Sequence, residues 1–185
     1  MEIVKLINRH IETVEKLKGE QLQNIAKIAK ICNKAIESGH KILLCGNGGS
    51  AADSQHIAAE FVGRFHRERV SLPAIALTTD TSILTAVAND YDYADIFRRQ
   101  VEGLGNAGDV LIGITTSGNS ANVVKALEMA KEKGMHTIAF TGSKDSKASQ
   151  ISEVTLNVPS TETARIQECH ILVGRLICQF ADEQY

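Results

Sequence analysis

The sequence predicts an α/β protein built on a parallel, doubly wound sheet. Five short apolar runs begin near residues 41, 74, 109, 136 and 154, and each ends in small or polar residues. They are too short for typical helices and do not alternate with polar residues, as expected of strands buried on both faces. Helical stretches follow three of them, at 50–64, 93–103 and 119–133, the last ending at Gly134. Strand followed by helix, repeated, is typical of a parallel sheet.

The rest of the chain fits a single domain. Residues 3–38 carry apolar side chains near helical spacing, and we expect two helical pieces broken near Gly19. A chain of 185 residues, 43% of them hydrophobic, has room for one sizeable core. We therefore expect one domain over 1–185, with a helical segment at 1–38 and the α/β core at 39–185.

Composition excludes several classes of partner. The formal charge is −2, the pI is near 6.3, and the 20 Lys and Arg residues form no long run, which argues against direct binding to nucleic acid. There is no leader and no apolar run of membrane-spanning length. Cys32, Cys45, Cys169 and Cys178 form no CxxC pair. We expect a reduced, cytoplasmic protein that does not enter the membrane, with two disulfides as the less favoured alternative.

A glycine-rich loop, "CGNGGSAAD", follows the first predicted strand. Its spacing is not the GxGxxG of a dinucleotide-binding turn, and it lacks the GKS or GKT of a P-loop. Gly48 and Gly49 let the backbone turn sharply, Ser50 can cap the next helix, and Asn47 offers an amide to a ligand hydroxyl. A plain turn between strand and helix remains the alternative.

A second loop, "ITTSGNSAN", follows the third predicted strand and carries the hydroxyl groups of Thr115, Thr116, Ser117 and Ser120. One hydroxyl would be enough to cap the next helix, whose exposed amides favour an anion. The loop has no lysine, so it suits a sugar phosphate better than a nucleoside triphosphate. We therefore favour phosphate binding over capping alone.

Further polar side chains lie on two predicted helices. His56 and Glu60 are four residues apart, so they project from one helix face toward one ion or one substrate. Two ligands do not complete a zinc site, and an ordinary surface pair is the alternative. On the amphipathic helix "TARIQECHILVGRLICQF", the polar side chains of Gln167 and His170 could reach a site.

Four long motifs together resemble the phosphoheptose isomerases of the sugar isomerase (SIS) domain superfamily. They are "CGNGGSAAD…HIAAEF", "ALTTDTSILTAVANDY", "GDVLIGITTSGNSANVVKAL" and "TARIQECHIL", and the resemblance covers almost the whole chain from residue 40. It implies a flavodoxin-like, five-stranded parallel sheet and a homotetramer held largely by helices, with the 1–38 segment as assembly surface and active sites shared between subunits.

The resemblance also implies an activity and a set of site residues. The reaction is the interconversion of sedoheptulose 7-phosphate and D-glycero-D-manno-heptose 7-phosphate, for bacterial lipopolysaccharide core or other surface glycans. The residues implied to bind the substrate are Asn47, Gly48, Gly49, Ser50, Glu60, Arg64, Asn89, Asp90, Thr115, Thr116, Ser117, Ser120 and Gln167. Glu60 and Gln167 are the implied catalytic residues, and His56, Glu60 and Gln167 the implied zinc ligands.

Arg175 departs from the family pattern, which has histidine there as fourth zinc ligand and proton-transfer group. Arginine stays protonated and offers no lone pair. A unit charge about 4 Å from a divalent ion would cost about 8 kcal/mol at an effective dielectric of about 20, twice the value for two unit charges. Arg175 must therefore point away from zinc, bind a substrate anion, or mark a site without zinc.

The mechanism that fits these residues moves a proton between adjacent carbons through an enediolate, with Glu60 as the base. Two other functions remain open. Some SIS relatives are non-catalytic tetramers that associate with the replication initiator, but the intact GNGGS loop and Glu60 favour the enzyme. An isomerase or sensor for another sugar phosphate is the third reading, because the loops specify phosphate more clearly than carbon count.

Overall fold

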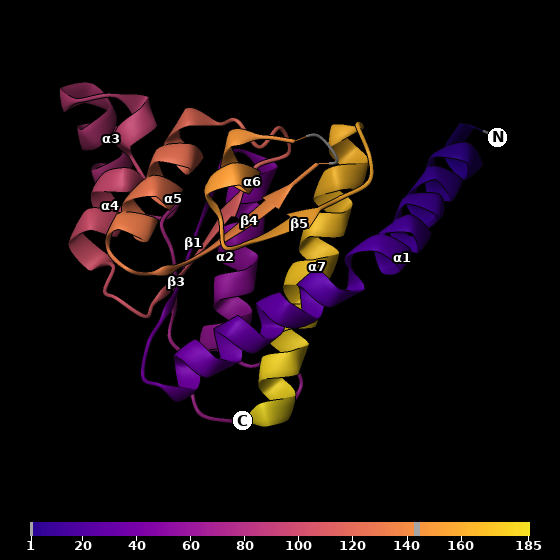
Figure 1. Cartoon of the computed structure of the whole chain (residues 1–185), viewed down its shortest axis with the longest axis horizontal. Helices are drawn as coiled ribbons and strands as arrows, with labels where there is room; N and C mark the ends of the chain where they lie inside the picture. The colour runs from indigo at the N-terminus through magenta and orange to yellow at the C-terminus, as the bar shows by residue number, and fades with distance from the viewer. Residues whose placement is uncertain (1, 143–144) are drawn as a thin grey trace.

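The computed structural model describes residues 2–142 and 145–185, which fold around one five-stranded sheet (Figure 1). The strands are β1 Ile42–Gly46, β2 Ala74–Ala76, β3 Val110–Ile114, β4 His136–Thr141 and β5 Val154–Asn157. The helices are α1 Glu2–Glu37, α2 Gly49–Val62, α3 Thr81–Asp90, α4 Arg98–Leu104, α5 Ala121–Glu132, α6 Lys147–Ile151 and α7 Thr163–Gln184, with a 3₁₀ turn, η1, at Tyr93–Asp95. The strand order is β2-β1-β3-β4-β5, all parallel, which confirms the predicted flavodoxin-like sheet.

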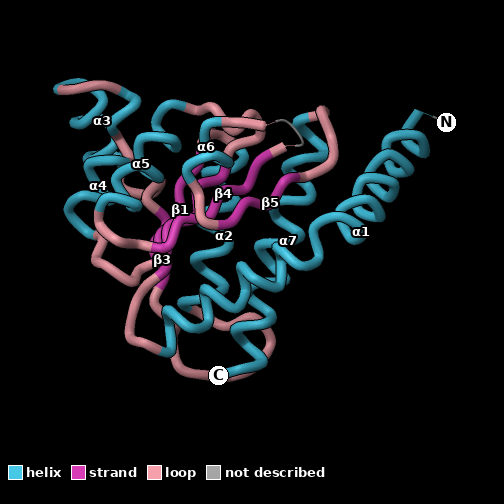
Figure 2. The backbone as a smooth tube through the Cα atoms, in the orientation of Figure 1, coloured by secondary structure: helices cyan, strands magenta, loops and turns pink. Residues whose placement is uncertain are grey.

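Helices cover both faces of the sheet (Figure 2), and an apolar core lies on each face. Ile42 and Leu44 of β1 pack in the core formed with α1, α2 and α7, whereas Leu43 and Cys45 pack in the core formed with α4, α5 and α6. Successive side chains of a strand point to opposite faces, so a strand covered on both sides reads as a continuous apolar run. This burial explains why the central strands β1, β3 and β4 were predictable from the sequence.

Helix α1 is continuous, so the predicted break near Gly19 is wrong. Gly19 is exposed, and a methyl group added to it would meet nothing within 4 Å. A single glycine costs a helix only about 1 kcal/mol relative to alanine, and the packing of Leu17 and Ile25 in the core, on either side of Gly19 in the helix, outweighs that cost. The first half of α1 projects away from the body of the molecule (Figure 1).

Two short helices had no clear sequence signal. No side chain of helix α3 is fully buried, and Leu84, Val87 and Ala88 pack only partly against the core, so the apolar face of this 10-residue helix is narrow. Its start is fixed by Asp80, whose carboxylate accepts a hydrogen bond of 2.9 Å from the amide of Ile83. Helix α6 has only five residues. The predicted helix 93–103 is divided into η1 and α4.

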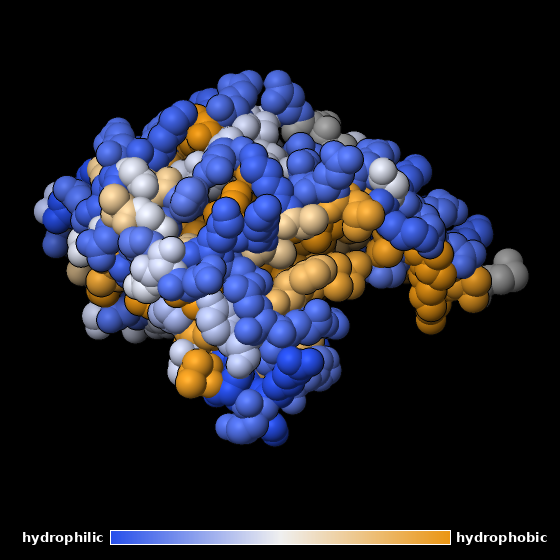
Figure 3. Space-filling model, turned by 60° about the horizontal axis from the view of Figure 1, so that its bottom comes forward, coloured by the Kyte–Doolittle hydropathy of each residue, from blue (hydrophilic) through white to orange (hydrophobic). Residues whose placement is uncertain are grey.

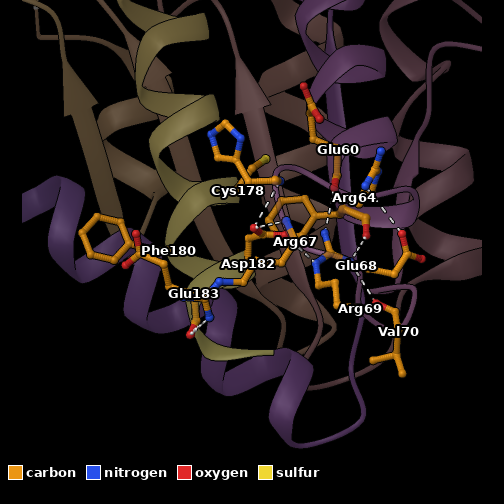
Figure 4. Close-up of polar contacts among 12 residues, drawn as sticks. Glu60, Arg64, Arg67, Glu68, Arg69, Val70, Cys178, Phe180, Asp182 and Glu183 are labelled. Atoms are coloured by element: carbon orange, nitrogen blue, oxygen red, sulfur yellow. Dashed lines mark hydrogen bonds and ion pairs between the residues drawn. The ribbon is translucent and has the colours of Figure 1, made fainter.

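A buried ion pair joins the loop after α2 to the last turn of α7 (Figure 4). Arg69 Nε donates to Asp182 Oδ1 at 3.1 Å, and their side chains are 0% and 3% exposed. The same carboxylate accepts from the amides of His66 and Arg67, at 3.2 and 2.9 Å. Burial alone would raise the pKa of Asp182, but these amides and the guanidinium lower it.

The other donors of Arg69 hold the end of α2. Nη2 donates to the carbonyl of Glu60 at 2.8 Å, and Nη1 to that of Phe61 at 2.9 Å. These are among the last carbonyls of the helix, which have no partner inside it and attract a positive charge. Arg69 therefore fixes the segment of α2 that carries the Glu60 side chain, and ties it to α7.

We predict that Asp182→Ala lowers the free energy of unfolding by about 3–5 kcal/mol, because it leaves Arg69 as an unpaired buried charge. The pKa of Asp182 is lower in the folded state, so this stabilisation is present above about pH 4 and is lost as pH falls through the folded value. Urea unfolding at fixed protein concentration measures the change. Glu183→Ala, at the exposed neighbouring position, should stay within about 0.5 kcal/mol of wild type; equal effects of the two variants would contradict the prediction.

Candidate active site

Two predicted loops meet where the strand order reverses. The glycine loop follows β1 and the hydroxyl loop follows β3, and these strands are neighbours in the sheet. The side-chain amides of Asn47 and Asn122 bond to each other in both directions, at 2.9 and 2.8 Å. Tyr93 also donates to Asn47 Oδ1, at 3.1 Å. The sequence analysis missed Asn122 and Tyr93, because residues so far apart in the chain carry no local sign of their contact.

The glycine loop takes the shape that its residues allow. Gly48 has a φ of 57°, a conformation that side chains disfavour, and it is the residue that precedes α2. The prediction that Ser50 caps α2 is wrong, because Ser50 lies inside the helix. The residue at the cap position is Gly48, which has no side chain to accept a hydrogen bond. A methyl group on Gly49 would lie 2.8 Å from Gln167 Nε2. The missing side chain thus leaves room for Gln167, which lies against this loop as part of the same cluster.

The side chains of the hydroxyl loop do not cap helix α5. Thr115 Oγ1 lies 2.9 Å from Ser120 Oγ and 3.4 Å from Ser117 Oγ. Ser120 is the residue that precedes α5, yet its side chain makes no hydrogen bond to the helix. The first-turn amides of Ala121 and Asn122 in this 12-residue helix therefore stay available to an anion, whereas that of Val123 donates to Asn122 Oδ1 at 3.0 Å.

A cavity of about 340 Å³ opens beside the hydroxyl loop. Its polar lining comes from Thr116, Ser117, Asn119, Ser160, Thr161 and Thr163. Ser160 and Thr161 lie in the segment that leads into α7 and Thr163 is the first residue of that helix; none of the three was predicted from the sequence. The run "PSTET" is rich in hydroxyl groups, which could have drawn attention to it. The cavity places a second set of hydroxyl groups opposite the first.

Another charged cluster lies farther along α2. His56 Nε2 is 3.0 Å from Glu60 Oε1, and Arg175 Nη1 is 3.2 Å from the same nitrogen and 3.5 Å from the same oxygen. The side chains of His56 and Arg175 are 45% and 46% exposed, while that of Glu60 is 20% exposed. The Arg175 guanidinium also lies 5.2 Å from the centre of the Phe65 ring. Arg175 therefore points toward the predicted base, which answers one question that the sequence left open.

Among the described residues, the predicted zinc ligand Gln167 makes no hydrogen bond or ion pair with the other two, His56 and Glu60. Gln167 lies beside Gly49, and eleven residues of helix put Glu60 about 16 Å farther along α2. Among the residues described, no three His, Cys, Asp or Glu side chains are grouped closely enough to share a metal ion. The lone-pair atoms of His56 and Glu60 face a guanidinium, which can only donate. As they stand, these side chains do not fit a tetrahedral zinc.

Three other predicted residues lie apart from both clusters within one chain. Asn89 Nδ2 donates to Asp90 Oδ1 at 2.8 Å at the exposed end of α3. Arg64 pairs with Glu68 at 3.6 Å, with both side chains largely exposed. Their roles in substrate binding stay predictions.

His170 does not reach the candidate site. Its side chain is buried, and Nε2 donates to the carbonyl of Thr141 at 3.2 Å on the sheet side of α7. Burial lowers the pKa of His170 to about 4, and the hydrogen bond to Thr141 opposes the shift only in part. His170 and Arg175 are five positions apart, which puts the two side chains on different faces of the helix.

Comparison with known proteins agrees with this geometry. The model of the SIS domain family matches residues 6–142. A phosphoheptose isomerase of Aquifex aeolicus is 60% identical over 161 residues, which cover 87% of this chain and 84% of that protein. A phosphoheptose isomerase of Aliarcobacter butzleri is 51% identical over 182 residues, which cover 98% of this chain and 96% of that protein. The structure of phosphoheptose isomerase from Neisseria gonorrhoeae superposes with a TM-score of 0.93 at 44% identity, covering 98% of this chain and 97% of that one.

A parallel sheet of this order, with a hydroxyl loop and a glycine loop at its switch point, defines a SIS domain. Most of the chain is matched at high identity by isomerases of one kind. The chain belongs to the phosphoheptose isomerase family.

We predict that Asn47 and Asn122 are energetically coupled, because each amide satisfies the other. Alanine at either position leaves a partly buried amide without its partner, at a cost of about 1–3 kcal/mol. The double variant should therefore lose less than the sum of the two single losses, with a coupling energy of about 0.5–3 kcal/mol from urea unfolding. Additive losses would show that the pair does not tie the two loops together.

We also predict that acid destabilises the protein through His170. Its folded pKa of about 4 lies below the ordinary value near 6.5, so the neutral form is favoured by folding. The stabilisation is present above about pH 6.5 and is lost as pH falls toward 4, by up to about 3 kcal/mol. His170→Phe should flatten the dependence of unfolding free energy on pH in this range, whatever its stability at pH 7. An unchanged slope would contradict the assignment.

Proposed function

We propose that this protein interconverts sedoheptulose 7-phosphate and D-glycero-D-manno-heptose 7-phosphate. The observation that carries the proposal is the pair of clusters at two levels of α2: loops suited to a sugar phosphate at its start, and the Glu60 carboxylate near its end. The phosphate and the reacting carbons lie at opposite ends of the substrate, so a site for it needs two such regions. The identity with phosphoheptose isomerases supports this choice of substrate.

The hydroxyl loop binds the phosphate in this scheme. Thr115, Ser117 and Ser120 offer hydroxyl groups that bond to one another rather than to the helix, and the first-turn amides of α5 add a favourable dipole. The glycine loop and Gln167 lie one strand away and meet the sugar hydroxyl groups. The reciprocal pair of Asn47 and Asn122 keeps the two loops at a fixed distance.

Glu60 is the base. It removes a proton from carbon 1 of the ketose and, after the enediolate has formed, returns one to carbon 2. Its carboxylate is held by contacts with His56 and Arg175, and its own backbone carbonyl by Arg69. This support fixes the direction of the carboxylate, which proton transfer requires.

A second copy of the chain completes the site. Gly49 and Glu60 lie about 16 Å apart along α2, and within one chain Arg64, Asn89 and Asp90 make no hydrogen bond or ion pair with either cluster among the described residues. The first half of α1 exposes Ile3, Val4, Leu6, Ile7 and Ile11, visible as an apolar stripe on the projecting helix (Figure 3). Such a patch is typical of an interface, and it supports the homotetramer with shared active sites.

The setting of this activity is also a proposal. In the part of the chain that the structure describes, no helix is long and apolar enough to cross a bilayer. The four cysteines are buried and unpaired, which supports a reducing cytoplasm. The heptose phosphate product would serve lipopolysaccharide core or another bacterial surface glycan.

We predict that Glu60→Gln folds normally and loses about 10²- to 10⁴-fold in kcat/KM, because an amide cannot accept the proton. The assay follows formation of the aldose from sedoheptulose 7-phosphate. Glu128→Gln, the same change at an exposed position of α5, should keep wild-type activity. Wild-type turnover by Glu60→Gln would remove Glu60 from the mechanism, and a preference for a five- or six-carbon sugar phosphate would reassign the substrate.

A further inference from the structure

Among the residues that the structure describes, Arg175 is the one arginine or lysine in contact with the side-chain carboxylate of Glu60, the predicted base. Nη1 lies 3.5 Å from Glu60 Oε1 and 3.2 Å from His56 Nε2. The Phe65 ring lies under the guanidinium, with Cζ 5.2 Å from the ring centre, and such a contact holds an arginine by its face. The side chains of Glu60, His56 and Phe65 thus hold the Arg175 guanidinium in this position.

His56 Nε2 makes only one hydrogen bond at a time in this cluster, because the same nitrogen faces both the Arg175 donor and the Glu60 acceptor. Arginine only donates and an ionised carboxylate only accepts, whereas histidine nitrogen does one or the other. A bare His56 Nε2 accepts from Arg175, and a protonated one donates to Glu60. A divalent ion would need both lone pairs and would stand beside a fixed positive charge.

We propose that Arg175 is the electrophile of this site, a fixed cation that makes the isomerisation independent of metal. The inference rests on the proposed function. Nη1 is occupied by Glu60 and His56, while Nε and Nη2 have no polar partner among the described residues. These N–H groups point to a role as donors to the oxygen that becomes negative during the reaction. The side chain is 46% exposed, so a substrate can reach it.

The step balances without any further reactant. Glu60 takes a proton from carbon 1, the electron pair forms the C1–C2 double bond, and the carbonyl oxygen on carbon 2 becomes the oxyanion to which Arg175 donates. The hydroxyl proton on oxygen 1 then passes to oxygen 2, and Glu60 returns its proton to carbon 2. The C1=O aldehyde forms, and Arg175 stays protonated throughout.

The first experiment measures metal content as well as turnover. Wild-type protein, dialysed against zinc and then desalted, should hold much less than one zinc per chain by elemental analysis, and a chelator should leave its isomerase activity unchanged. Arg175→His should gain zinc, approaching one per chain, because imidazole supplies the lone pair that arginine lacks. Stoichiometric zinc in the wild type, with activity lost to the chelator, would overturn the proposal.

The second experiment tests the charge itself. Arg175→Ala should lose about 10²- to 10³-fold in kcat, the usual effect of removing an oxyanion donor, and added guanidinium ion should restore part of it where sodium chloride does not. Arg99→Ala is the matched control, since Arg99 is an exposed arginine that lies 4.5 Å over the Tyr91 ring, and it should keep wild-type activity. Rescue excludes a purely structural role for Arg175.

The outcomes separate this inference from the proposed function. An active wild type with an equally active Arg175→Ala overturns the role of Arg175 and leaves the isomerase assignment intact. An inert wild type with an active, zinc-loaded Arg175→His also overturns it, since arginine would then impair the site. If wild type and Arg175→His are both inert on sedoheptulose 7-phosphate, the proposed function itself fails.

Discussion

The close parallel packing of α2 against α7 is the constraint on which the rest of the site depends. A methyl group on Gly174 would lie 2.8 Å from Ile57 Cγ1, so glycine lets the two helices approach there. Nearer their starts, Gly49 leaves room for Gln167 in the same way. Because Ile57 and Gly174 are neighbours in sequence of His56 and Arg175, the contact that packs the core also brings the Arg175 charge to Glu60. Arg69 and Asp182 then fix the far ends of both helices through buried hydrogen bonds.

How far the sequence predicts this protein follows from how local each signal is. The central strands β1, β3 and β4 were predictable because their burial on both faces gives uninterrupted apolar runs, whereas the edge strands β2 and β5 are buried mainly on one face. The helix break predicted near Gly19 was wrong, because a glycine at an exposed helix position lowers stability only slightly and does not end the helix. Helix α3 was missed because it is short and its apolar residues, Leu84, Val87 and Ala88, are only partly buried.

The candidate site was less predictable than the fold, because its geometry depends on long-range contacts. The hydroxyl and glycine loops can be recognised by their composition. Asn122, which joins them, resembles any other polar residue in the first turn of a helix. The Arg69–Asp182 pair spans more than a hundred residues and leaves no periodic trace. Even the resemblance to a family could say only that position 175 was unusual. The direction of the Arg175 side chain required the packing of α7 against α2.

An arginine in place of a metal changes what the site depends on. A metal ion is held by lone pairs whose availability varies with pH and with metal supply. A guanidinium keeps its charge across the physiological range and is delivered by folding itself. Its geometry is then only as exact as the packing beneath it. The stem of Arg175 is flexible, so the ring of Phe65 and the two acceptors on α2 must define its position. The stability of the α2–α7 contact and the placement of the positive charge are therefore one property of the fold.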